Sequence, residues 1–253
     1  EAPEQYVEFR DDIVLNGLTE TQLLKYIMHD VDVIGISLMF SGNWLHNRHL
    51  IDFLGQNFPK ATIIAGGEHV TAIPELCINQ TKHLKLCVLG EGEECIIEVI
   101  SAIQKNKSYE DINGIVFRNY KNEPQRTESR KRIREIDKIS WPAWEYFPLV
   151  KYKESGIIYG VDRGVYSVPL SATRGCPYEC VFCSSPQMWG TRYFMRPPED
   201  VVNEMEYFKN KFGVLNFDFF DLTAIINKRW IIEFAQELIT RGLNITWQIP
   251  AGT

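Results

Sequence analysis

The chain has 253 residues, of which 45% are hydrophobic and 24% charged, and its formal net charge is −6. This composition is that of a globular protein with one large or two ordinary domains, and the negative charge argues against nucleic acid as the main partner. No apolar run reaches the ~20 residues that a membrane-spanning helix needs, and the acidic, polar first residues do not resemble a signal peptide. Because the chain lacks an initiating Met, we expect it to begin inside a longer protein.

The first part of the chain, residues 1–118, alternates short apolar runs with helical patterns. Runs of β-branched and small residues predict buried strands over 31–37, 61–67 and 84–90. Apolar residues at helical spacing predict helices between and after them, over 45–58, 70–78 and 92–104. Such alternation predicts a Rossmann-like parallel sheet with helices on both faces.

Residues 119–165 interrupt this rhythm and are predicted to be a linker. The segment 123–138 is highly charged. Its basic residues are interleaved with acids, which indicates a solvated face rather than a binding patch; they are Arg126, Arg130, Lys131, Arg132 and Arg134.

A second βα pattern occupies residues 166–253. We expect a strand over 167–173, a cysteine-containing loop, and a helix over 198–212 with Glu199 and Asp200 in its first turn. A strand over 215–220, a helix over 228–241 and a strand over 244–249 follow. This order predicts the opening part of a parallel (β/α) barrel, and because a barrel needs more units, we expect the chain to be cut at its C-terminus.

The spacing Cys-x-x-x-Cys-x-x-Cys places Cys176, Cys180 and Cys183 on one short loop. A cubane iron–sulfur cluster normally takes four thiolates, so three leave one iron without a protein ligand. An open coordination position distinguishes a catalytic metal site from a closed structural one. A small bidentate ligand, such as the amine and carboxylate of an amino acid, can bind there.

Other interpretations of these cysteines are a zinc site, a ferredoxin-type electron carrier or core packing. Zinc and ferredoxin sites both require further ligands, and the second half of such a motif is missing near the loop. The remaining cysteines, Cys77, Cys87 and Cys95, are expected to be small core residues. A metal loop in place of a disulfide pattern indicates a reducing compartment, so we expect a cytoplasmic protein.

The cysteine motif, Phe182 before its last cysteine and the βα pattern that follows resemble the radical S-adenosylmethionine superfamily. This resemblance implies a 4Fe–4S cluster on the three cysteines and reductive cleavage of S-adenosylmethionine to methionine and a 5′-deoxyadenosyl radical. It also implies an external electron donor of the flavodoxin or ferredoxin type, and S-adenosylmethionine contacts at Phe182 and Asp221. Related sequences often carry two adjacent acids at this point, where this chain has Asp221 and Leu222.

The first part resembles the cobalamin-binding domain that precedes the barrel in one large subclass of that superfamily. The resemblance lies in Gly35-Ile36-Ser37, Gly66-Gly67-Glu68-His69 and Gly90-Glu91-Gly92-Glu93, each at the end of a predicted strand. It implies cobalamin contacts at Ser37, Gly66, Gly67, Glu68, Gly90, Glu91 and Gly92. The D-x-H-x-x-G motif that supplies an axial histidine in some cobalamin enzymes is absent, and His69 is expected to be a packed residue. The first strand of the usual domain is expected to be missing before Glu1.

Together these features predict an α/β protein with a cobalamin-binding sheet followed by part of a radical S-adenosylmethionine barrel. The predicted function is a cobalamin-dependent radical enzyme that transfers a methyl group to a carbon of a small-molecule substrate. A cobalamin-linked oxidative cyclase is an alternative within catalysis. A cobalamin or iron–sulfur protein that binds or senses without turnover is an alternative of another class.

Overall fold

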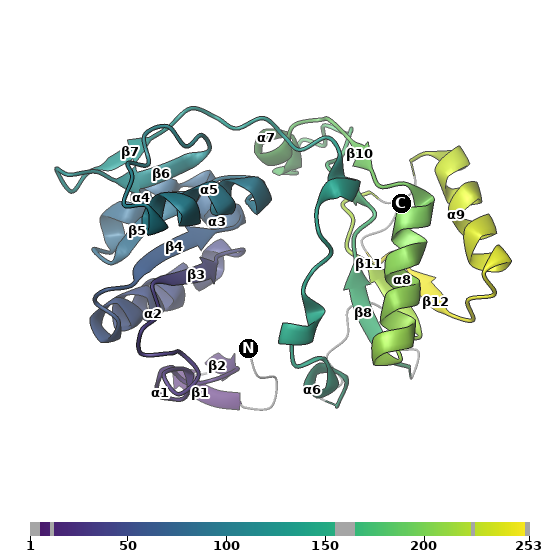
Figure 1. The fold of residues 1–253 in the computed structure, drawn as a ribbon, viewed down its shortest axis with the longest axis horizontal. Helices are drawn as coiled ribbons and strands as arrows, with labels where there is room; N and C mark the ends of the chain where they lie inside the picture. Colours follow the sequence, from purple (N-terminus) through teal and green to yellow (C-terminus); the bar gives the residue numbers. More distant parts are fainter. Residues whose placement is uncertain (1–5, 11–12, 155–164, 224–225, 251–253) are drawn as a thin grey trace. The chain divides into compact units, whose positions relative to one another are not determined.

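The computed structural model describes residues 6–10, 13–154, 165–223 and 226–250. The chain forms two compact units, Thr19–Ile133 on the one hand and Glu1–Leu18 with Arg134–Thr253 on the other. Figure 1 shows the elements of both units. Among the described residues, no helix is both long and apolar enough to cross a membrane.

A five-stranded sheet forms the centre of the unit Thr19–Ile133. Its strands, in spatial order, are β3 (Val33–Ser37), β4 (Thr62–Gly66), β5 (Leu84–Val88), β6 (Ile115–Arg118) and β7 (Pro124–Arg126). The pairings β3–β4 and β4–β5 are parallel, as the sequence predicts. The pairings β5–β6 and β6–β7 are antiparallel, so the sheet is mixed rather than wholly parallel.

The last strand of the sheet, β7, lies within residues 119–165, which the sequence predicts to be a linker. Strand β7 pairs with β6 through a connection too short for a crossover, which makes the pair antiparallel. Arg126 and Arg130 of the charged segment form ion pairs with Glu75 and Glu98. Residues 119–133 therefore lie in the first unit.

Helices cover both faces of this sheet, as predicted. Their bounds are α1 (Glu20–Leu23), α2 (Trp44–Asn57), α3 (Glu68–Ala72), α4 (Pro74–Gln80) and α5 (Glu93–Gln104). Because neighbouring residues of a strand point to opposite faces, Ile63 packs in the core with α2, α3 and α4, and Ile64 packs with α5. Figure 1 shows the helices on the two sides of the strands.

A three-stranded parallel sheet forms the centre of the other unit. Its strands are β8 (Ser167–Leu170), β11 (Asn216–Phe219) and β12 (Thr246–Gln248), with β11 in the middle. Helices α8 (Pro198–Phe212) and α9 (Lys228–Thr240) join them in the predicted βα order. Helix α8 starts at a proline, where a missing N–H costs nothing, and ends at Gly213 in the left-handed conformation.

Smaller elements complete this unit. They are β1 (Tyr6–Arg10), β2 (Ile13–Asn16), α6 (Leu149–Glu154), β9 (Thr173–Arg174), α7 (Ser185–Trp189) and β10 (Phe194–Met195). Strand β9 belongs to a separate ladder with β10, so the single strand predicted over 167–173 is wrong beyond Leu170. Single turns of 3₁₀ helix lie at residues 136–138 and 144–146 of this unit and at residues 41–43 of the unit Thr19–Ile133.

Candidate cluster loop and cofactor edge

The three-cysteine loop is closed at its base by a short antiparallel ladder. Arg174 pairs with Phe194 and Thr173 with Met195, so the ends of the loop 175–193 lie side by side. The backbone N–H of Arg196 also donates to the carbonyl of Ala172, at 2.9 Å. Because β9 follows directly after β8, the loop begins at the carboxyl end of a parallel strand, where α/β proteins bind their ligands.

The environments of the three thiols differ. Cys176 is partly buried, whereas Cys180 and Cys183 are exposed. The N–H of Cys183 donates to the carbonyl of Cys180 at 3.0 Å, which forms a tight turn between the two exposed thiols. The N–H of Ser185 lies 3.4 Å from the Sγ of Cys183, in hydrogen-bonding geometry. Hydrogen bonds to cysteine sulfur are among the means by which proteins tune iron–sulfur clusters.

The donor set on this loop suits a cluster. Three accessible thiols on one short loop can each bind a different corner of a cubane. Within the described residues, no group of three or more His, Cys, Asp or Glu side chains surrounds a point where a single metal ion could bind.

The other cysteines lie in the core of the first unit, as expected. Cys77, Cys87 and Cys95 are completely buried. Burial raises the pKa of Cys77 and of Cys95 to about 11, and it raises the pKa of Cys87 further. These thiols therefore stay protonated at neutral pH and behave as small apolar residues.

Asp221 contacts the residues that precede the cysteine loop and is almost completely buried. Its carboxylate accepts hydrogen bonds from the N–H of Ala172, at 3.1 Å, and from the N–H and hydroxyl of Thr173. Burial raises the pKa of Asp221, while these hydrogen bonds oppose the rise. In this arrangement the carboxylate holds the end of β8 and the start of the loop. The contacts of Asp221 and of the exposed Phe182 with S-adenosylmethionine stay predictions.

Sequence reasoning missed a buried arginine beside the loop. The guanidinium of Arg196 donates to the carbonyl of Ser171 at 2.9 Å, and it pairs with Asp200 at 2.6 Å and with Glu204 at 2.5 Å. Burial raises the pKa of Glu204, against the effect of Arg196. The spacing of Arg196 and Asp200 suggests only an ordinary helix pair; the link to Ser171 depends on the tertiary fold.

The predicted cobalamin residues gather at the carboxyl ends of β3, β4 and β5. The segments that follow these strands are hydrogen-bonded to one another. The N–H of Leu38 donates to the carbonyl of Gly66 at 2.7 Å, the N–H of His69 to the carbonyl of Leu38 at 3.0 Å, and the N–H of Gly90 to the hydroxyl of Thr71 at 3.0 Å. This edge therefore brings together the residues around Ser37, Gly66 and Gly90, although they lie far apart in the chain.

Two of the predicted cobalamin residues also have structural roles. Gly67 has a φ of 107°, and a Cβ there would lie 2.7 Å from the carbonyl oxygen of Leu38. The carboxylate of Glu91 is buried. It accepts from the N–H of Ile133 at 2.7 Å and forms an ion pair with the guanidinium of Arg132 at 3.4 Å. The contacts of both residues with cobalamin stay predictions.

His69 is packed, in agreement with the expectation from sequence. Its Nδ1 lies 2.9 Å from the hydroxyl of Ser41, and its ring centroid is 5.0 Å from that of Trp44. The ring is 3% exposed, and burial lowers its pKa. The imidazole is therefore neutral at pH 7.

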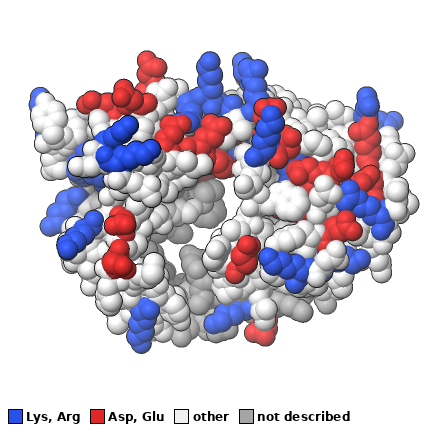
Figure 2. Space-filling view, viewed as in Figure 1, with Lys and Arg blue, Asp and Glu red and all other residues white. Residues whose placement is uncertain are grey.

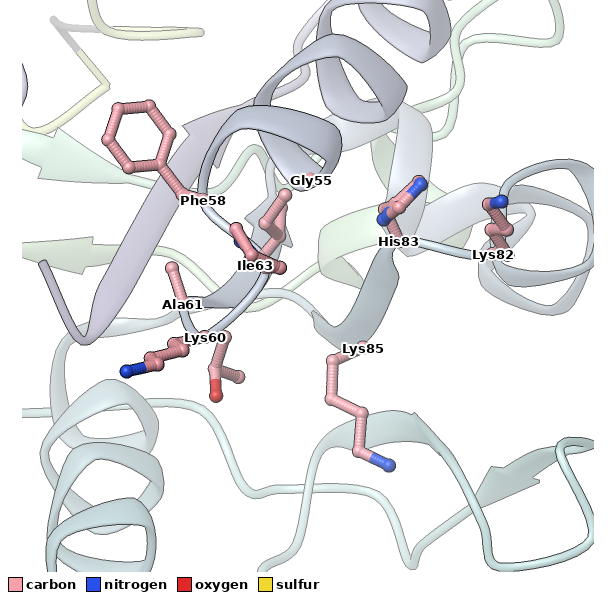
Figure 3. A pocket seen from close by; sticks show the side chains of 10 residues that line it. Gly55, Phe58, Lys60, Ala61, Ile63, Lys82, His83 and Lys85 are labelled. Carbon is pink, nitrogen blue, oxygen red and sulfur yellow. The ribbon is translucent and has the colours of Figure 1, made fainter. Parts of the chain in front are cut away.

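A pocket on the same unit lies near the opposite edge of the sheet, where Thr62 begins β4 and Leu84 begins β5. Lys60, Lys82 and Lys85 line it (Figure 3). The side chains of Lys60 and Lys85 extend in different directions there, and Lys85 donates to the carbonyl of Arg118 at 2.8 Å. On the face that Figure 2 shows, basic and acidic side chains are interspersed.

Comparison with known proteins gives two family matches. Residues 10–100 match the model of the B12 binding domain, and residues 170–253 match the model of the Radical SAM superfamily.

Among curated proteins, an uncharacterised methyltransferase of Pyrococcus horikoshii is 29% identical over 95% of this chain and 51% of its own length. The cytidylyl-2-hydroxyethylphosphonate methyltransferase of Streptomyces wedmorensis is 27% identical over 98% of this chain and 50% of its own length. The anaerobic magnesium-protoporphyrin IX monomethyl ester cyclase of Rubrivivax gelatinosus is 28% identical over 94% of this chain and 42% of its own length. The chain thus spans about half the length of the curated relatives that it matches.

Solved structures share the fold. The radical S-adenosylmethionine methyltransferase TsrM of Kitasatospora setae matches with a TM-score of 0.67 at 18% identity, over 88% of this chain and 43% of that one. The cobalamin-dependent S-adenosylmethionine radical enzyme OxsB matches with a TM-score of 0.74 at 18% identity, over 91% of this chain and 32% of that one. The chain therefore combines a B12 binding domain with a domain of the Radical SAM superfamily.

Proposed function

We propose that this chain is the cofactor-binding part of a cobalamin-dependent radical S-adenosylmethionine enzyme that methylates a small molecule. The observation that carries the proposal is the loop of Cys176, Cys180 and Cys183 at the carboxyl end of β8, in a chain that also holds a B12 binding domain. The matched methyltransferases support the reaction type.

In this proposal Cys176, Cys180 and Cys183 hold a 4Fe–4S cluster. The loop has no fourth cysteine, which leaves one iron for the amine and carboxylate of S-adenosylmethionine. When bound, the reduced cluster supplies the electron that cleaves S-adenosylmethionine to methionine and a 5′-deoxyadenosyl radical. The exposed ring of Phe182 lies on the same loop, where it can pack against that ligand. Asp221 holds Ala172 and Thr173, the residues that lead into the loop.

Cobalamin is proposed to bind at the carboxyl ends of β3, β4 and β5. The proposed contacts are Ser37, Gly66, Gly67, Glu68, Gly90, Glu91 and Gly92. Next to Ser37, Met39 is 47% exposed and Phe40 is 71% exposed. Exposed apolar side chains beside glycine-rich strand ends provide a surface on which a large, flat ring can pack.

Oxidative cyclisation is a second candidate reaction. Relatives named as magnesium-protoporphyrin IX monomethyl ester cyclases match this chain at 28% and 32% identity. Both reactions would use the same cluster loop, so they differ in the substrate and in the fate of its radical.

The chemistry also requires a source of electrons. We propose an external one-electron donor of the flavodoxin or ferredoxin type, acting in the cytoplasm. The three thiols of the cluster loop must stay reduced to bind iron, which suits a reducing compartment.

Anaerobic reconstitution tests the proposal. The chain would be loaded with iron and sulfide, reduced with dithionite and incubated with S-adenosylmethionine. We expect 5′-deoxyadenosine and methionine in the products, and cobalamin that stays with the protein after desalting. A non-catalytic binding protein would retain a cofactor but release no 5′-deoxyadenosine.

A further inference from the structure

The hydroxyl of Thr223 touches one cysteine of the cluster loop. Its Oγ1 lies 3.2 Å from the Sγ of Cys176, in hydrogen-bonding geometry. Thr223 follows β11 and is 5% exposed. A buried hydroxyl therefore lies against the partly buried sulfur, in the segment after β11 rather than on the loop itself.

Both ends of the cysteine loop hold Thr223 in place. Its carbonyl accepts from the hydroxyl of Tyr193 at 2.9 Å, near the end of the loop. The hydroxyl of Thr173, just before the loop, lies 3.4 Å from the same carbonyl oxygen. That hydroxyl has a single proton and donates it to Asp221, its shorter contact. The Tyr193 hydrogen bond and this contact together fix the backbone from which the Thr223 hydroxyl reaches Cys176.

Iron binding decides which atom is the donor. A cysteine binds iron as the thiolate, which has no proton and can only accept. The threonine hydroxyl can rotate, so it donates to the sulfur of Cys176 whenever that sulfur is a ligand. Cys183 has a different partner, the backbone N–H of Ser185, which a side-chain substitution does not remove.

We propose that Thr223 is a positioning residue that raises the reduction potential of the cluster through the Cys176 thiolate. The inference depends on the proposed function, because it requires the loop to hold a cluster. The step that it favours is the gain of one electron by the cluster from an external one-electron reductant. No bond to Thr223 forms or breaks. The extra electron makes the sulfur ligands more negative, so a hydrogen bond to sulfur stabilises the reduced form more than the oxidised form.

The test is a redox titration of the reconstituted full chain, followed by electron paramagnetic resonance of the reduced cluster. Thr223→Val keeps the shape of the side chain but removes the hydroxyl, and Thr223→Ser keeps the hydroxyl as a matched control. At a fixed potential we expect the ratio of oxidised to reduced cluster to rise about tenfold in Thr223→Val, which corresponds to a midpoint about 59 mV lower for a one-electron couple. The serine variant should stay close to the wild type. Iron content should be equal in all three proteins.

Two outcomes count against the inference, and they are distinguishable. A wild-type chain that assembles no cubane cluster overturns the proposed function and this inference with it. A normal cluster whose midpoint is the same in wild type and Thr223→Val overturns the inference alone. If the valine variant fails to bind iron, Thr223→Ala is titrated in its place and the same comparison applies.

Discussion

Gly67 offers a sharp test of the packing at the carboxyl ends of β3, β4 and β5, where cobalamin is proposed to bind. Its backbone has a φ of 107° and a ψ of 179°, a combination that side chains with a Cβ rarely adopt. In a Gly67→Ala variant the new Cβ would lie 2.7 Å from the carbonyl oxygen of Leu38 and 2.9 Å from its carbonyl carbon. Leu38 cannot move away easily, because its N–H donates to Gly66 and its carbonyl accepts from His69.

The expected cost has two parts. Forcing alanine into this backbone conformation costs about 1–3 kcal/mol, and crowding the Leu38 backbone costs about 1–3 kcal/mol more. The sum is a large fraction of the about 5–15 kcal/mol by which a domain is stable. Gly67→Ala should therefore unfold at a clearly lower urea concentration than the wild type.

Gly66→Ala is the matched control. A Cβ at Gly66 would meet its nearest atom, the carbonyl oxygen of Val88, only at 4.0 Å. Its stability should stay within about 1 kcal/mol of the wild type. The assay is urea unfolding by circular dichroism, with hydrogen exchange of peptides from residues 33–69 to locate the loss. Equal unfolding midpoints for the two variants would contradict this prediction.

Three further predictions follow from individual side chains. Cys180→Ala should lose the reconstituted iron while Cys95→Ala keeps it, and near-normal iron in Cys180→Ala would refute the ligand assignment. Arg196→Met should cost about 3–5 kcal/mol in thermal unfolding, because it leaves Glu204 buried without its ion pair; a loss below about 1 kcal/mol would contradict this. Burial lowers the pKa of His69 below its ordinary 6.5. On acidification the unfolded chain therefore takes up the proton first. The free energy of unfolding that neutral His69 contributes above pH 6.5 is lost as the pH falls through the pKa of the folded state. Urea unfolding at about pH 7 and about pH 5 should show this loss in the wild type, and His69→Gln should reduce it.

The elements of both sheets could be predicted where local pattern and burial agree. Strand β4 is β-branched and buried, and β5 is apolar and mostly buried. Strand β3 is β-branched too, but it lies at the end of the strand order and is partly exposed, so the burial predicted for it is wrong. The helices between these strands have a clear apolar face. The cysteine ligands could be predicted because all three lie within eight residues. A ligand set this close in the chain needs no knowledge of the tertiary fold.

What sequence reasoning missed depends on contacts between distant residues. Strand β7, Pro124–Arg126, is short and polar, and the ladder of β9 and β10 has two residues on each side. Neither is long enough to show a periodicity. The contact of Thr223 with Cys176 joins residues 47 positions apart. It forms because β8 and β11 are adjacent in the sheet, so no local sequence pattern predicts it.

In the proposed function, three cysteines leave one iron of the cluster open to S-adenosylmethionine. Electron paramagnetic resonance of the reduced, reconstituted chain tests this directly, before and after S-adenosylmethionine is added. We predict that the signal changes on addition, because the ligand binds the iron that lacks a cysteine. An unchanged signal from an intact cubane, or a purified chain that contains zinc in its place, would contradict the proposed open iron.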